Sequence, residues 1–300
     1  MRSQCPTDIL YGDLKTSSLL LLDLLGPAAP HEWAPTFSRL QVARFEEIVW
    51  QHIHLAAFGQ LRVLTLNYCA CEAVDHLHEL LRNNCKTLER LHLSVSPDMI
   101  PETQEFQPIL LPKLRKLSFL VACEVLNPHI SVRAPREFII SHATGFFRSL
   151  VTPEVMELQV FAPCIQNLNL GTHFPSLQHL RIIFPDTIDE ISSYVRNLSS
   201  LLTVAPLQTI ELFIAIHTFH PPEVKYNMAM ALGAFLCHPF VLDHPTLTGF
   251  ILKSKLDFEP LRERVRPKWM RANKRLHIDK ATDEECRSGG FMVGTYVIPR

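Results

Sequence analysis

The sequence lacks the features that define several large classes of protein. Lysine and arginine number 29 against 30 acidic residues, so no excess of positive charge indicates a nucleic-acid partner for the whole chain. No run of about 18 apolar residues predicts a transmembrane helix, and we expect no membrane partner. Glycine-rich phosphate loops and the HExxH and GxSxG motifs are absent. We therefore expect no enzyme, no catalytic residues, no metal and no cofactor.

Cysteine is also scarce. Eight cysteines in 300 residues fall far below the density of a disulfide scaffold, which indicates an intracellular protein, cytoplasmic or nuclear, with reduced thiols. The leucine run 19–22 is the one candidate for an export signal. Asp23 interrupts it, and a signal peptide needs an unbroken apolar stretch of about 7–15 residues. We do not expect the run to be a signal peptide.

Leucine is abundant, with 44 residues, and it recurs in the pattern Leu-x-x-Leu-x-Leu. The spacing between instances varies, because insertions separate the later ones. The alternation within each instance is typical of a half-buried strand, and the whole is the signature of a leucine-rich repeat. The clear instances are Leu61/Leu64/Leu66, Leu88/Leu91/Leu93, Leu114/Leu117/Phe119, Val155/Leu158/Val160, Leu177/Leu180/Ile182, Leu207/Ile210/Leu212 and Leu247/Phe250/Leu252, with weaker ones at Leu40/Ala43/Phe45 and Ile165/Leu168/Leu170.

Prolines precede many of these instances, where they disfavour helix and tolerate a strand start. Between the instances, residues 72–83 and the stretch from Pro221 have apolar residues at helical spacing, and Thr187 opens a capping box. The fold class we predict is α/β, an irregular leucine-rich-repeat solenoid with a parallel concave sheet and convex helices. It spans residues 37–254 with an insertion near 120–152, between an N-terminal segment 1–36 and a C-terminal cap 255–300.

The proline-led strands at Pro112 and Pro175 resemble the irregular repeat region of fungal F-box proteins. The resemblance covers roughly residues 37–254, and only residues 5–10 (Cys-Pro-Thr-Asp-Ile-Leu) are similar to an F-box opening. It implies a substrate-recognition subunit of a cullin–RING ubiquitin ligase. It also implies a Skp-type adaptor as partner if an F-box is present. The alternatives are a free-standing scaffold without a ligase link and an enzyme that uses cysteine and histidine.

The candidate binding surface is the concave face, where one residue per strand points away from the core. We expect a protein partner there. The first column is polar and of mixed charge: Thr65, His92, Ser118, Gln159, Arg181, Glu211 and then Ile251. The second column has large apolar side chains at its middle: Leu120, Phe161, Ile183 and Phe213. These four residues are either anchors of an open groove or are covered by the chain's own insertions.

Three other groups of residues have structural explanations that we favour over functional ones. Cys69 and Cys71 with His76 and His78 are similar to a zinc ligand set, but two histidines two apart share no helical face. His217, His220, His238 and His244 lie near Cys237 in sequence without a catalytic motif. The basic segment 262–275 is expected to be a solvated cap rather than a patch for nucleic acid or an anionic membrane. The cap would have one apolar face (Leu261, Val265, Trp269, Leu276) and an interruption at Pro267.

Overall fold

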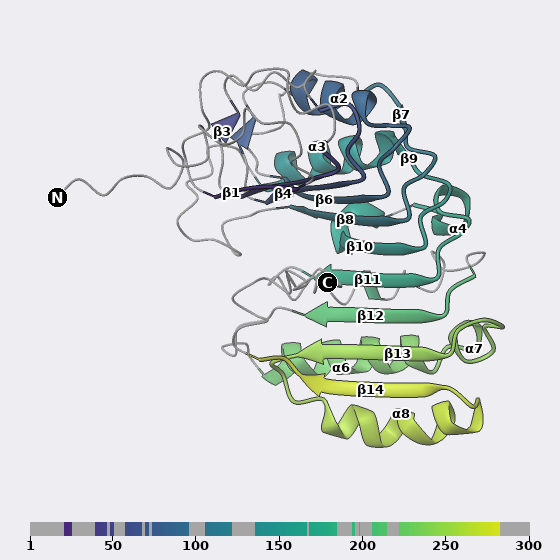
Figure 1. Ribbon diagram of the computed structural model, residues 1–300. Coiled ribbons are helices and arrows are strands. Elements are labelled where there is room, and N and C mark those ends of the chain that lie inside the picture. Colours follow the sequence, from purple (N-terminus) through teal and green to yellow (C-terminus); the bar gives the residue numbers. More distant parts are fainter. Residues whose placement is uncertain are drawn as a thin grey trace.

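The protein is a mixed α/β structure built on one large parallel sheet (Figure 1). The computed structural model describes residues 21–25, 40–46, 49–50, 58–67, 70–71, 74–95, 106–121, 136–166, 168–184, 194–195, 198, 206–214 and 222–282. Within these ranges ten strands pair in chain order, all in parallel. They are β1 (Leu21–Leu25), β2 (Val42–Glu46), β4 (Val63–Asn67), β6 (Arg90–Val95), β8 (Lys116–Val121), β10 (Glu157–Phe161), β11 (His179–Phe184), β12 (Thr209–Ile214), β13 (Gly249–Ser254) and β14 (Arg275–Lys280).

The apolar positions of the repeated pattern face one side of this sheet and form the core. The register places Leu64 beside Leu91, and Leu91 beside Leu117. It continues in the same way through the following strands. The residues that the clear instances place in the core of a strand are buried, which confirms this part of the prediction: Leu64, Leu66, Leu91, Leu93, Leu117, Leu158, Leu180, Ile210 and Leu212.

A repeated backbone contact fixes this register. The carbonyl just before a strand accepts two hydrogen bonds from the next repeat, as Arg62 does from the amides of Glu89 and Arg90. The same pair of bonds recurs at the carbonyls of Gln41, Glu89, Arg115, Met156, Gln178 and Gln208. Each strand therefore begins level with its neighbour despite the unequal connections, because this contact does not depend on the length of the intervening chain.

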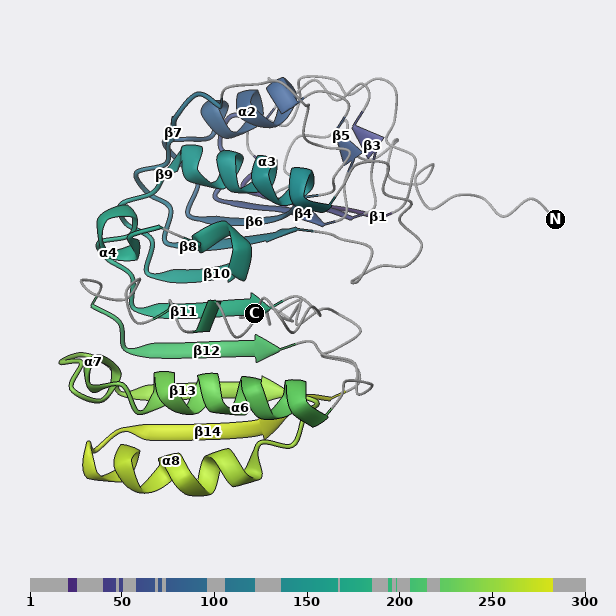
Figure 2. The same ribbon diagram turned by 180° about the vertical axis from the view of Figure 1, so that it is seen from behind.

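The principal helices lie on the core side of the sheet, as Figure 2 shows for α3 and α6. The helices predicted at 72–83 and after Pro221 are confirmed as α2 and α6, while the capping box at 187–190 lies outside the described residues. The helices are α2 (Val74–Asn83), α3 (Arg136–Ser149), the 3₁₀ helix η3 (Ala162–Ile165), α4 (Leu170–His173), α6 (Pro222–Leu236), α7 (Pro239–Leu242) and α8 (Glu259–Arg271).

Four local predictions are wrong. The sheet begins at β1, inside the segment 1–36 that we placed outside the repeats, and it ends with β14, inside the expected cap. The weak instance at Ile165 is not a strand, because η3 and α4 occupy that stretch. Helix α8 continues through Pro267 to Arg271, with its apolar residues docked on the core and its proline on the exposed side. Tertiary packing there outweighs the loss of one helical hydrogen bond.

Two short parallel ladders flank the main sheet. Strand β3 (Val49–Trp50) pairs with β5 (Ala70–Cys71), and β7 (Ile109–Leu110) pairs with β9 (Leu150–Val151). Over the described ranges, no helix has the length and apolar character needed to cross a membrane.

Candidate functional site

The face of the sheet opposite the core, here called the polar face, presents three rows of side chains. The register aligns them one per strand, so the predicted first column is a continuous central row. The central row is Thr65, His92, Ser118, Gln159, Arg181, Glu211, Ile251 and His277. The proximal row, two residues earlier, is Val63, Arg90, Lys116, Glu157, His179, Thr209, Gly249 and Arg275. The distal row, two residues later, includes Ser94, Leu120, Phe161, Ile183, Phe213, Lys253 and Asp279.

Ion pairs and hydrogen bonds connect neighbouring strands along these rows. In the central row, Arg181 Nε lies 3.3 Å from Glu211 Oε1, and the guanidinium carbon lies 5.7 Å from the centre of the Phe213 ring. In the proximal row, Lys116 Nζ lies 2.6 Å from Glu157 Oε1. The polar face is therefore of mixed charge, and part of its charge is neutralised locally.

The middle of the central row holds buried polar atoms whose hydrogen-bonding capacity is unused. Ser118 Oγ, Gln159 Nε2 and Arg181 Nη2 have no hydrogen-bond partner in the structure. A buried donor without a partner costs about 1–3 kcal/mol, so such atoms are uncommon away from binding sites. The three residues lie on adjacent strands, which concentrates this capacity at one place on the sheet.

His92, in the central row, has a pKa that its surroundings lower. Burial lowers the pKa of its imidazole from 6.5 to about 4, because the charged form loses its hydration. His92 is therefore neutral at pH 7 and adds no positive charge to the polar face.

The pKa of His92 predicts a dependence of stability on pH. The unfolded chain binds the proton near pH 6.5 and the folded chain only near pH 4, so acid favours unfolding. We expect His92 to leave stability unchanged above pH 6.5 and to lower the free energy of unfolding by about 3 kcal/mol by pH 4. Urea unfolding at several pH values measures this, with the His92→Gln variant as the reference. Parallel pH profiles for the two proteins would contradict the prediction.

The apolar part of the distal row is not an open groove. Leu120, Phe161 and Ile183 each retain 1% of their exposure and Phe213 retains none. Alternation places these residues on the polar face, although Phe161 also packs with the main core cluster. Burying each large apolar side chain is worth about 1.5–3 kcal/mol, which favours covering them. The proposal that these four residues anchor a partner is therefore wrong, and the alternative of a covered stripe agrees with their burial.

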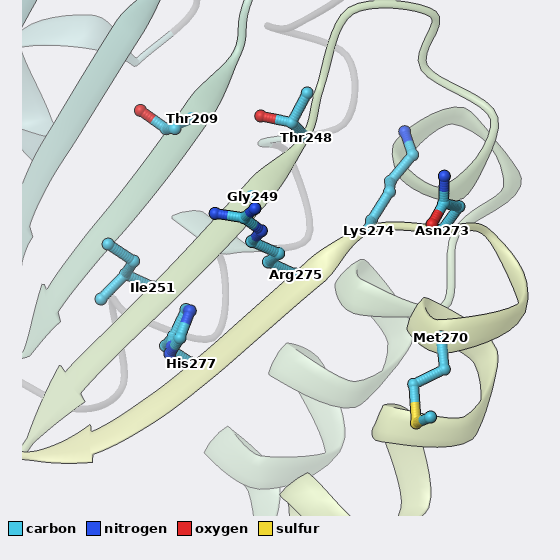
Figure 3. A pocket seen from close by; sticks show the side chains of 9 residues that line it. All are labelled: Thr209, Thr248, Gly249, Ile251, Met270, Asn273, Lys274, Arg275 and His277. Atoms are coloured by element: carbon cyan, nitrogen blue, oxygen red, sulfur yellow. The ribbon is translucent and has the colours of Figure 1, made fainter.

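A hollow of about 780 Å³ opens on the polar face at the C-terminal end of the sheet (Figure 3). Strands β12, β13 and β14 supply its floor, and the turn after α8 supplies one wall. Figure 3 shows Arg275 and His277 extending from β14 toward β13. The residues that line it are Thr209, Thr248, Gly249, Ile251, Met270, Asn273, Lys274, Arg275 and His277.

Two local features create this hollow. Gly249 has no side chain at the point where the proximal row passes from Thr209 to Arg275. Asn273 has a φ of 55°, a left-handed conformation that asparagine tolerates. The amide of Asn273 bonds the Met270 carbonyl and that of Lys274 bonds the Trp269 carbonyl, which is the Schellman arrangement that ends α8 and directs the chain into β14.

The histidine and cysteine candidates have local structural roles where the structure describes them. His78 is buried with its ring centre 5.3 Å from that of Phe146. His238 Nδ1 accepts a hydrogen bond from the Phe240 amide at the start of α7, and His244 is buried beside Phe240. The described residues do not include Cys69, His217 and His220, nor the side chains of Cys71 and His76. In the described part of the chain, no three histidine, cysteine or acidic residues form a metal-like cluster.

Cys164, the fully buried cysteine of α3's neighbour η3, is not an activated nucleophile. Burial raises the pKa of the Cys164 thiol to about 12, against smaller opposing effects from Thr144 and Arg148. Cys237 is half-buried at the end of α6, and the nearby His238 caps α7. A thiolate at neutral pH requires a lowered pKa, so Cys164 is unsuited to nucleophilic catalysis.

The sequence pattern predicts Ile251 on this face and a basic segment at 262–275, but it does not predict the hollow that they line. Gly249 was a possible signal of the hollow, because glycine within a strand often marks a close approach or an open space.

Comparison with protein-family models, curated proteins and solved structures returns no match to this chain.

Proposed function

We propose that the chain is a leucine-rich-repeat solenoid that binds a protein partner on its polar face. The observation that supports this best is the register, which aligns polar side chains of successive strands into continuous rows. Repeat proteins characteristically bind partners on such extended surfaces. The mixed charge of the rows suits specific recognition, since complementary charges select among partners.

The accessible parts of this surface are the proximal row, where Arg90 is also exposed, and the C-terminal end of the sheet. The distal row is buried from Leu120 to Phe213, whereas Arg275, His277 and Asp279 on β14 are exposed. Glu157 in the proximal row also keeps 46% of its side-chain exposure. A partner would therefore contact the proximal row and the end of the sheet rather than the apolar stripe.

Site-specific photocrosslinking tests this function in the cell of origin. A photoreactive amino acid at Glu157 or at His277 is expected to yield the same discrete crosslinked protein, because both positions face the partner. The matched control position is Tyr226, which is 65% exposed on helix α6 at the other face. An identical crosslink from Tyr226, or none from the two polar-face positions, would reject the proposal.

A link to a ubiquitin ligase is the more specific form of the proposal, and it is supported by the resemblance of the proline-led strands to fungal F-box proteins. Co-expression with a recombinant Skp-type adaptor tests it. Stoichiometric co-purification would support a substrate-recognition subunit. A chain that yields polar-face crosslinks but does not bind the adaptor would be a free-standing interaction protein.

A further inference from the structure

We propose that the hollow around Gly249 binds an acidic segment of a partner protein that also carries an aliphatic side chain. This inference rests on the proposed function and names the chemistry of the partner at one place on the polar face. It follows from the charge, the apolar contacts and the space of the hollow.

The charge of the hollow is positive. Lys274, Arg275 and His277 line it, and of the nine lining residues none is acidic. Arg275 and His277 are exposed, so both can reach a ligand. Lys274 Nζ donates to the carbonyls of Val241 at 3.1 Å and His244 at 2.7 Å, which holds its charge at the wall. Two acidic residues lie close to this lining. Glu211 is the register neighbour of Ile251 and pairs with Arg181, and Asp243 interacts electrostatically with Lys274.

Two aliphatic side chains lie beside Lys274 and Arg275. Met270, on the last turn of α8, is 67% exposed, and Ile251 on β13 is half-buried. Methionine adapts its shape to different apolar partners, and an exposed one at the rim of a hollow suits a docking site. Carboxylates alone would leave this apolar surface unused, so we infer a segment in which acidic and aliphatic residues are neighbours.

The lining favours a peptide over a nucleic acid. Proteins that hold single-stranded nucleic acids generally stack bases on aromatic rings. The hollow has no phenylalanine, tyrosine or tryptophan in its lining, and His277 is its one aromatic side chain. Carboxylates contacting Arg275 and His277, with an aliphatic side chain against Met270, fit the lining more completely.

Gly249 allows the hollow to be filled without disturbing the strand. A Cβ added there would lie 3.7 Å from Thr209 Cγ2 and 4.0 Å from the Arg275 carbonyl oxygen, which are ordinary contacts. Glycine is also a poor strand residue, so Gly249→Ala should fold at least as well as the parent. Gly249→Leu places a larger side chain in the space that the ligand would occupy.

The test uses fluorescence anisotropy with the full chain and a labelled decapeptide in which glutamate alternates with leucine. We expect this peptide to bind at least about tenfold more tightly than a peptide with lysine in place of glutamate, and the preference to weaken with salt. Gly249→Leu and Arg275→Glu should each raise the Kd about tenfold or more. Lys280→Glu makes the same charge change on the same strand outside the hollow and should have a much smaller effect.

Thermal unfolding shows whether each variant is folded, so that a loss of binding can be separated from a loss of structure. Arg275→Gln replaces Arg275→Glu if the latter fails to fold. Equal weakening by Lys280→Glu, or unchanged binding in Gly249→Leu, would overturn the proposal. Displacement of the peptide by a single-stranded oligonucleotide of higher affinity would overturn it in favour of a nucleic-acid site. Photocrosslinking from Glu157 and His277 distinguishes failure of this proposal from failure of the proposed function. A crosslinked partner without peptide binding rejects only the acidic ligand. The absence of both crosslinking and peptide binding rejects the proposed function.

Discussion

Replacing Asn84 with alanine is expected to lower the free energy of unfolding by about 4 kcal/mol. The Asn84 side chain is fully buried at the end of α2 and bonds three backbone groups. Its Oδ1 accepts from the Leu61 amide at 2.7 Å, and its Nδ2 donates to the carbonyls of Phe58 and Leu80. Alanine would leave the Leu61 amide buried without a partner, which costs about 1–3 kcal/mol. It would also remove one hydrogen bond from each of the two carbonyls, at about 0.5–1.5 kcal/mol each, while the Leu80 carbonyl keeps the backbone amide of residue 84.

The matched control is Asn83→Ala, since Asn83 is exposed and precedes Asn84 in the chain. It should change stability by less than about 0.5 kcal/mol. Asn84→Asp separates hydrogen bonding from shape, because it keeps the size of the side chain and loses the two Nδ2 donors. Urea unfolding that gives similar values for Asn83→Ala and Asn84→Ala would contradict the role assigned to Asn84.

The contrast between Asn84 and the leucines explains which parts of the fold the sequence predicts. Leu64 and Leu91 are found by alternation alone, because a half-buried strand must place every second residue in the core. The helical spacing over residues 72–83 does not predict any contact of Asn84. Its contacts with Phe58 and Leu61 join residues more than twenty positions away in sequence, which no local pattern encodes.

Local alternation also predicts which residues lie on the polar face, but not which of them are accessible. Alternation places Arg181 and Glu211 on that face, and the register then brings them together. Whether Phe213 is exposed depends on what else packs over the sheet. Alternation therefore predicts the face on which Phe213 lies but not that its side chain is buried. The hollow depends on Gly249 and on the turn at Asn273, which approach each other only when α8 is folded.

The C-terminal end of the sheet depends on one aromatic anchor, Trp269. Its side chain is fully buried in α8, its ring centre lies 5.8 Å from that of Phe250 on β13, and its Nε1 donates to the Leu236 carbonyl at 2.9 Å. Trp269 thereby ties α8 to both α6 and the core. Because α8 leads directly into β14, the same anchor supports the wall of the hollow.

Trp269→Ala is therefore expected to lower the free energy of unfolding by about 3–5 kcal/mol, through lost burial and the cavity left behind. Trp269→Phe retains most of the ring packing but removes the donor to Leu236, so a smaller loss of about 1–3 kcal/mol is expected. Met270→Ala is the control for stability, since Met270 is 67% exposed on the same turn. Hydrogen exchange should show the loss in Trp269→Ala first at the amides of α8 and β14, because β14 lies at one edge of the described sheet and pairs with β13 alone. Uniform loss of protection across all strands would instead mean that the sheet unfolds as one unit, and that α8 is integral to the core rather than a docked cap.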